Sequence, residues 1–214
     1  MSPRTLLPLW AAIISSVLAS PLAMAADAPA TTAPAAAAAT PSAKVELFNG
    51  KDLTGWTSFL KGGTPAAETW SVKDGLLACT GKPNGFLRTE KSYKQYKFTV
   101  EWRFTKPGNT GVVVHMTAPD AIWPKSIECQ GMNKNQGDFY FWSGATSKEG
   151  VAMKAKDGTI RGYRIGKQLD AEKPAGEWNT FTTICDKDTV TILVNGKEVN
   201  KATGTNLSEG FIGL

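Results

Sequence analysis

Histidine and cysteine are scarce in this sequence, with one His and three Cys among 214 residues. This scarcity excludes the usual zinc sites, which need several His or Cys ligands at set spacings. Cys79, Cys129 and Cys185 are odd in number and far apart, and each lies in an alternating apolar segment. We therefore expect three buried free thiols and no disulfide.

The excess of positive over negative residues is also small. Lys and Arg total 24 and Asp and Glu total 19, which gives a net charge of +5 at pH 7. Nucleic-acid-binding domains gather their basic residues into a patch or stripe. Here those residues are dispersed, so we expect no nucleic-acid partner. Hydrophobic residues at 42% and charged residues at 20% are typical of a globular protein.

The N-terminus has the pattern of a secretory signal. Arg4 precedes an apolar segment from Leu6 to Ala19, and Ala23-Met24-Ala25 fits the small-x-small cleavage rule. The apolar segment is shorter than the ~20 residues that a membrane-spanning helix needs, which disfavours an uncleaved anchor. We predict a signal peptide over residues 1–25, export to the periplasm or the extracellular space, and no membrane span after cleavage.

The next segment, residues 26–43, consists almost entirely of Ala, Pro and Thr. Such a tract has little to bury and cannot offset its ordering entropy, so we expect a disordered linker. The folded part is then expected over residues 44–214, which is long enough for a single domain with one core.

The folded part shows the two-residue period of β-strands. Residues 96–105 place Tyr96, Phe98, Val100, Trp102 and Phe104 on one face and polar side chains on the other. Asp74-Gly75 and Asn195-Gly196 each lie between two such runs, which is the strongest short hairpin signal. No segment keeps a helical apolar period. The pattern predicts an all-β antiparallel sandwich or jelly roll, with further strands at 110–117, 125–131, 137–142, 177–185 and 210–214.

Polar side chains recur on these alternating strands. Glu128 and Gln130 share one face of their strand, and Glu101 and Arg103 share the polar face of another. If the strands belong to one sheet, these residues and His115 line one surface, which suits the many hydroxyl groups of a sugar. A cross-strand ion pair is an equally weighted alternative for Arg103, and a packed core histidine is the alternative for His115.

Two tryptophans are candidate platforms for sugar rings. Trp123 and Trp142 lie next to Pro124 and to Ser143-Gly144, in expected loops. The other tryptophans of alternating or turn contexts are expected in the core: Trp56, Trp70 and Trp178.

Several segments, in their order along the chain, resemble the 3-keto-disaccharide hydrolase domain family. The most specific is the opening Leu47-Phe48-Asn49-Gly50-Lys51-Asp52-Leu53-Thr54-Gly55-Trp56. The others are residues 70–77, 86–89, 93–104, 108–112, 126–130, 176–179 and 194–196. The resemblance implies a concanavalin A-like jelly roll. Because relatives continue with one more strand, it also implies that the domain over 44–214 lacks its final strand.

The resemblance further implies cleavage of glycosidic bonds in sugars oxidised at C3, by hydrolysis or by elimination. A 3-ketone acidifies the hydrogen on C2, so that a base can form an enolate which expels the C1 substituent. The implied catalytic candidates, with His115 or Glu128 as the base, are His115, Glu128 and Glu101. The implied substrate-binding candidates are Gln130, Arg103 and Asn109. A divalent metal held by Glu128 and His115 is a further hypothesis.

Two other classes of protein remain open at this stage: a non-catalytic carbohydrate-binding module and a surface-interaction domain carried on the linker. Catalysis needs an enclosed concavity around the acid or base, whereas a binding module tolerates an open groove. The depth of the site therefore discriminates between them.

Overall fold

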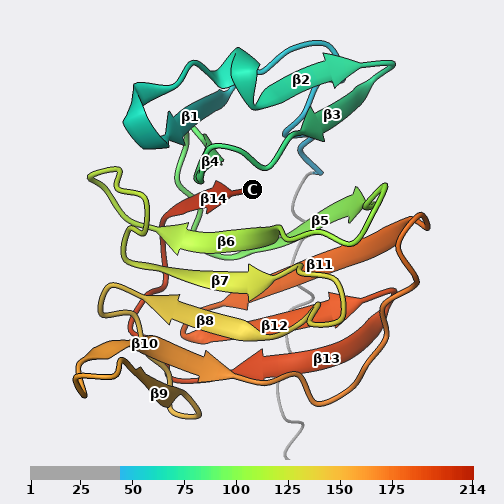
Figure 1. Ribbon diagram of the computed structural model, residues 1–214. Helices are drawn as coiled ribbons and strands as arrows, with labels where there is room; N and C mark the ends of the chain where they lie inside the picture. Colours follow the sequence, from blue (N-terminus) through green and yellow to red (C-terminus); the bar gives the residue numbers. More distant parts are fainter. Residues whose placement is uncertain (1–43) are drawn as a thin grey trace, which may run out of the picture. The chain divides into compact units, whose positions relative to one another are not determined.

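The computed structural model describes residues 44–214 (Figure 1). The predicted signal peptide, residues 1–25, and the predicted linker, residues 26–43, lie outside the described residues. Within residues 44–214, no helix has the length and apolar character needed to cross a membrane.

Two antiparallel sheets and one hairpin make up the fold. The large sheet has the order β1-β4-β14-β6-β7-β8-β10-β9, formed by β1 (Trp56–Leu60), β4 (Gly85–Thr89), β14 (Phe211–Gly213), β6 (Gly111–Met116), β7 (Ser126–Gln130), β8 (Phe139–Trp142), β10 (Ile160–Ile165) and β9 (Val151–Lys154). The small sheet has the order β13-β12-β11-β5, formed by β5 (Tyr96–Trp102), β11 (Asn179–Asp186), β12 (Thr189–Val194) and β13 (Lys197–Ala202). The hairpin is β2 (Trp70–Lys73) with β3 (Leu76–Cys79), preceded by the short 3-10 helices η1 (Lys61–Gly63) and η2 (Ala66–Glu68).

The predicted all-β antiparallel jelly-roll sandwich is confirmed. Both predicted hairpin turns are present, and their central residues have the left-handed φ angles that a two-residue turn requires. These angles are 52° and 75° at Asp74 and Gly75, and 51° and 79° at Asn195 and Gly196. Strand periodicity and turn residues therefore predicted these two hairpins correctly, whereas β1, β9 and β10 were not among the predicted strands.

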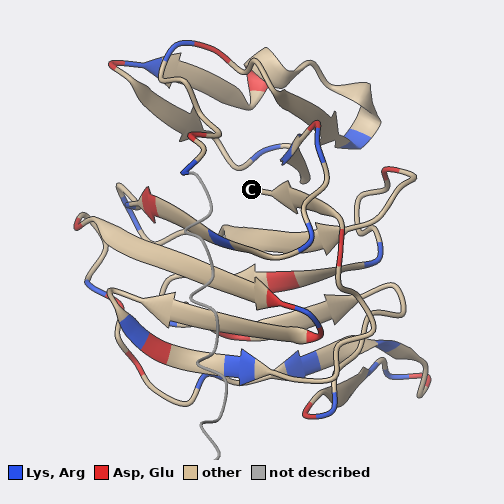
Figure 2. Cartoon of the chain, turned by 180° about the vertical axis from the view of Figure 1, so that it is seen from behind, with Lys and Arg blue, Asp and Glu red and all other residues tan. Residues whose placement is uncertain are grey.

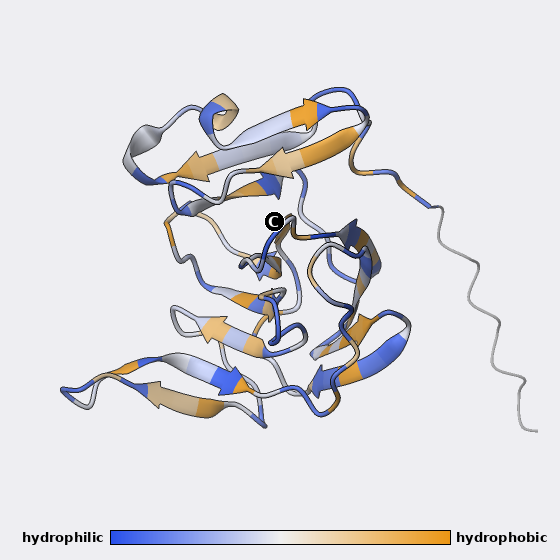
Figure 3. Cartoon of the chain, turned by 45° about the vertical axis from the view of Figure 1, so that its right-hand side comes forward, coloured by the Kyte–Doolittle hydropathy of each residue, from blue (hydrophilic) through white to orange (hydrophobic). Residues whose placement is uncertain are grey.

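The main core lies between the two sheets. Alternate residues of β6, β7 and β8 point toward alternate residues of β5, β11 and β12, and Figure 3 shows apolar segments on these strands. Phe181 is fully buried and stacks on Trp102, with ring centroids 4.7 Å apart. Cys129 and Cys185 are buried free thiols as expected, but Cys79 is exposed, so the prediction of three buried thiols was wrong for that residue.

A smaller core cluster joins the β2–β3 hairpin to β1 and β4. Its buried members are Trp56, Trp70 and Leu87, so two of the three tryptophans expected in the core are there. The hairpin therefore packs next to β1 and β4, at one end of the large sheet (Figure 1). Acidic and basic residues are interspersed along the strands and loops of residues 44–214 (Figure 2).

Candidate active site

Glu128 lies in the middle of β7, in register with Val113 of β6 and Tyr140 of β8. Its neighbours along the chain belong to the main core, so strand alternation turns Glu128 to the other face of the large sheet. Only 8% of the residue is exposed. Gly111 leaves room for the carboxyl group, because a Cβ atom at that position would lie 3.3 Å from both Cγ and Oε1 of Glu128.

The indole of Trp142 holds this carboxyl group. Trp142 Nε1 donates a hydrogen bond of 2.7 Å to Oε2 of Glu128. Burial raises the pKa of Glu128, and the bond from Trp142 opposes part of that rise. Trp142 itself contacts two aromatic rings: Tyr140 is stacked on it at 5.7 Å between centroids, and Trp123 lies at 5.0 Å. The carboxyl group of Glu128 therefore has one fixed hydrogen-bond donor, little contact with solvent and a raised pKa.

A cleft of about 360 Å³ opens over Glu128. The β2–β3 hairpin supplies one wall, and the loop between β6 and β7 supplies another. Trp123 is 52% exposed there. The structure thus brings four of the predicted site residues to one cleft, namely Glu128, Trp142, Trp123 and Asn109. A cleft of this size, with one buried carboxyl group and an exposed indole, can enclose a sugar ring.

The predicted pairing of His115 with Glu128 is wrong. His115 has a φ of 52°, and the pairing of β6 with β14 shifts register around it. This bulge turns the imidazole into the main core, where it is fully buried and lies edge-on to Tyr96 of the opposite sheet, at 5.8 Å. Glu128 and His115 therefore lie on opposite faces of the large sheet, and they cannot hold a divalent metal together. Residues 44–214 contain no group of three His, Cys, Asp or Glu side chains suited to a metal ion.

Glu101 and Arg103 are also separated from the cleft. Glu101 is on β5, which belongs to the small sheet, and its exposed carboxylate accepts a hydrogen bond from the hydroxyl of Thr180. Arg103 follows β5, and its guanidinium lies 5.2 Å from the ring centroid of Trp178. Trp178 is 40% exposed, so its expected place in the core was wrong. The prediction assumed that the strand with Glu101 and Arg103 belongs to the same sheet as β7. This assumption is wrong, because β5 belongs to the small sheet and β7 to the large one.

Gln130 shares the face of Glu128 on β7, as predicted, but it lies outside the lining of the cleft. Its side-chain Oε1 accepts a hydrogen bond of 2.9 Å from the backbone N–H of Met132. Gln130 is 7% exposed and shapes the turn after β7.

Sequence reasoning missed several residues that line the cleft. Trp70 and Cys79 reach it from the β2–β3 hairpin, and Asn84 reaches it from the segment before β4. Nothing in the pattern of these segments tells which strands they face. Gly111 did carry a signal, because a glycine inside a strand pattern often marks a close approach by another group.

The buried imidazole leads to a prediction about stability. Burial lowers the pKa of His115, so the folded state resists protonation that the unfolded chain accepts below about pH 6.5. The contribution of His115 to the free energy of unfolding should therefore decrease as the pH falls from 7 to 5. His115→Asn tolerates the positive φ and has no such proton. In denaturant titrations across this range its stability should decrease less, and parallel curves for the two proteins would contradict this account.

The sheet order defines an all-β sandwich of the jelly-roll class, with a buried carboxyl group on one face of its large sheet. The chain belongs to the 3-keto-alpha-glucoside-1,2-lyase-like domain family, whose model matches residues 43–214. It is 24% identical over 179 residues to a 3-keto-disaccharide hydrolase of Bacteroides thetaiotaomicron, a match that spans 72% of this chain and 57% of the length of that relative.

Two solved structures are similar in fold. One is a candidate glycosyl hydrolase from Parabacteroides distasonis, with a TM-score of 0.55, 20% identity, and coverage of 78% of this chain and 84% of that chain. The other is a carbohydrate-binding module from Bacillus subtilis, with a TM-score of 0.50, 14% identity, and coverage of 74% and 85%.

Proposed function

We propose that this protein cleaves the glycosidic bond of 3-keto-glycosides, with Glu128 as the base that removes the proton on C2. The observation that supports this proposal is the buried carboxyl group of Glu128, whose pKa is raised and which Trp142 holds at the wall of a sugar-sized cleft. Membership of the family and the name of the Bacteroides relative point to the same substrate class.

The reaction begins when the Glu128 carboxylate takes the C2 proton, and the electron pair of that C–H bond enters the enolate of the 3-ketone. The enolate then expels the C1 substituent: the C1–O bond breaks, its electron pair leaves with the oxygen, and that oxygen takes the proton from Glu128. Water adds to the resulting C1=C2 bond, with its oxygen on C1 and hydrogen on C2. One carboxyl group can serve both proton transfers, and Glu128 is the only carboxyl side chain among the described residues that line the cleft.

The test is incubation with matched 3-keto-glucosides and unoxidised glucosides, with and without a chelator, while release of the leaving alcohol is followed. We expect release from the keto-sugar alone, because only the ketone acidifies the C2 hydrogen. Isolation of the C1=C2 enone before water adds would make the enzyme a lyase, and direct formation of the 3-keto-sugar would make it a hydrolase. Cleavage of the unoxidised glucoside at an equal rate would contradict this mechanism.

A non-catalytic carbohydrate-binding module is the second candidate function. The exposed indole of Trp123 at the cleft supports it, because a binding module needs an aromatic platform and no base. Binding of unmodified glycans in titration calorimetry, with no release from any keto-sugar, would establish this second function in place of the first.

Export is a separate proposal, which rests on the N-terminal pattern described above. We expect cleavage after Ala25, so that the mature chain begins at Ala26. Expression in a Gram-negative host followed by fractionation and intact mass spectrometry checks this. Recovery of the chain with Met1 intact in the soluble cytoplasmic fraction would contradict it.

A further inference from the structure

An open surface leads away from the Glu128 cleft across the large sheet. Glu128 is in register with Tyr140 of β8, Tyr140 with Arg164 of β10, and Arg164 with Val151 of β9. Residues directly opposite each other on paired strands point to the same face of a sheet. These side chains therefore form one row that ends at the edge strand β9 (Figure 1). The part of this face over β8, β10 and β9 is called the apolar strip below, and it consists of Trp142, Tyr140, Arg164, Met153 and Val151.

The apolar strip begins at the cleft and continues to the edge of the sheet. Trp142 lines the cleft, and its ring is stacked on that of Tyr140, at 5.7 Å between centroids and 8° between planes. Gly162 of β10 is in register with both Trp142 and Met153 of β9, so Met153 belongs to the same face. Val151, at the far end, is 70% exposed. Exposed apolar surface that is continuous with a cleft is typical of a binding site.

The polar groups along the apolar strip already have partners. Arg164 donates from Nε and Nη2 to the carboxylate of Asp138, whose side chain is only 2% exposed, and its guanidinium lies 5.7 Å from the ring centroid of Tyr140. Trp142 Nε1 donates to Glu128. With these donors occupied, the strip offers aromatic and aliphatic surface rather than hydrogen bonds. Such a surface suits a planar apolar group better than a hydroxyl-rich ring.

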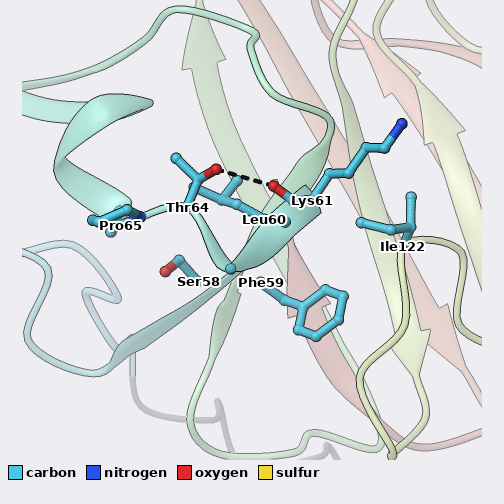
Figure 4. A pocket seen from close by; sticks show the side chains of 10 residues that line it. Ser58, Phe59, Leu60, Lys61, Thr64, Pro65 and Ile122 are labelled. Atoms are coloured by element: carbon cyan, nitrogen blue, oxygen red, sulfur yellow. Dashed lines mark hydrogen bonds between the residues drawn. The ribbon is translucent and has the colours of Figure 1, made fainter.

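The other side of the cleft has a different character. There Leu60 and Ile122 line both the cleft and a second space, of about 410 Å³, beside the turn at η1. Figure 4 shows the side chains of Lys61 and Thr64 at this space, where the hydroxyl of Thr64 donates to the carbonyl of Lys61. The ammonium group of Lys61 would lose water against an apolar ligand, which costs free energy. An apolar group attached to a sugar in the cleft is therefore better placed along β8, β10 and β9.

We propose that the apolar strip binds the leaving group of the substrate when that group is a planar apolar aglycone, a phenol with two or more fused rings. The inference rests on the proposed function, and it adds aryl 3-keto-glycosides to the substrate class. The sugar ring lies over Glu128, and the aglycone lies on Trp142 and Tyr140 and extends toward Val151. Three strand spacings separate β7 from β9, about 14 Å in all, which is enough for two or three fused rings. When the C1–O bond breaks, its electron pair stays on the phenolic oxygen, and that oxygen takes the proton from Glu128.

The first test compares 2-naphthyl 3-keto-glucoside with methyl 3-keto-glucoside. Val151→Ser combined with Met153→Ser removes apolar surface at the far end of the strip and leaves the cleft intact. We expect KM for the naphthyl substrate to rise about fivefold, the scale of burying roughly one methylene group, and KM for the methyl substrate to change less than about twofold. Each variant is compared with the wild type on the same substrate, because a phenol leaves more readily than methanol. Leu76→Ser is the matched control, since Leu76 is an exposed apolar residue of β3 outside the cleft lining, and it should affect neither substrate.

The second test does not depend on turnover. Glu128→Gln, with and without the pair Val151→Ser and Met153→Ser, is titrated with 2-naphthyl glucoside and with methyl glucoside in a calorimeter. We expect the pair to weaken binding of the naphthyl ligand about fivefold and to leave the methyl ligand unchanged. Naphthyl binding should also have the more negative heat-capacity change, which reports apolar burial. Equal effects on both ligands, or no effect on either, would overturn the proposal. Failure of the wild type to cleave either keto-sugar, together with this selective loss of binding, would overturn only the proposed reaction.

A second copy of the chain is the other occupant that an exposed edge strand can take. Sedimentation velocity over a range of protein concentrations tests for it. We expect a mass that does not change with concentration, which leaves Val151 free for the aglycone. A dimer that Val151→Ser dissociates would show that β9 is covered by its own copy, and it would overturn the proposal.

Discussion

Glu128→Gln is expected to lower turnover of a 3-keto-glycoside by at least ~10²-fold, the scale of a positioned acid or base. Glutamine has the same shape and can still accept the hydrogen bond from Trp142 Nε1, but it has no carboxylate to remove the C2 proton. The measurement is kcat at saturating substrate. Glu101→Gln is the matched control, because that carboxylate lies on the exposed face of the small sheet, away from the cleft. Full activity of Glu128→Gln would move the base elsewhere.

The same substitution should change how stability depends on pH. Because burial raises the pKa of Glu128, the folded wild type holds this proton more tightly than the unfolded chain does. Its free energy of unfolding should therefore decrease as the pH rises through that raised value. Glutamine has no proton to lose, so Glu128→Gln should equal or exceed the wild type in stability at pH 7 and above. This result would separate a loss of chemistry from a loss of folding.

Trp142→Phe is expected to give the second large effect. It keeps an aromatic ring between Tyr140 and Trp123 but removes the donor to Glu128. A hydrogen bond to a charged group contributes about 1.5–3 kcal/mol, so kcat/KM at neutral pH should fall roughly tenfold or more.

The pH profile shows whether Trp142 acts through Glu128. The wild-type profile should lose activity on the acid side at a pH above the ordinary glutamate value, because the base must be ionised. Without the indole donor the pKa of Glu128 rises further, so in Trp142→Phe the loss should begin at a higher pH. Trp178→Phe, on the outer side near Arg103, serves as the control. A uniform loss of activity at every pH would indicate a structural role for Trp142.

Sequence periodicity placed Glu128 correctly because β7 is a regular strand between two paired neighbours. The same rule failed on the adjacent strand β6, at His115, because a single bulge reverses the side of the sheet to which a residue points. Neither the bulge nor its partner β14 is visible in the alternation of residues 110–117. Local pattern gives the face of a residue only where the strand stays regular.

Which strands lie next to a given strand is a separate question from which of its own residues are buried. The alternation of residues 96–105 correctly predicted a half-buried strand, but it carries no record of which sheet contains it. Glu101 and Arg103 were therefore placed on the wrong surface. The wall that Trp70 and Cys79 contribute was missed for the same reason, because packing of the β2–β3 hairpin beside the large sheet is a long-range contact. Alternation along one strand therefore predicts local burial, whereas the composition of a cleft depends on sheet order.

The hydrogen bond from Trp142 to Glu128 has an optical consequence. An indole that donates to a carboxyl group has a different electronic environment when that group is ionised and when it is neutral, so the near-ultraviolet spectrum of Trp142 records the charge on Glu128. Trp123 contacts the same indole and is half exposed at the cleft. Binding of a ligand against Trp123 should therefore also change this spectrum. The protein thus contains its own chromophore for titration of the proposed base, and the difference spectrum between the wild type and Trp142→Phe isolates it from the other tryptophans.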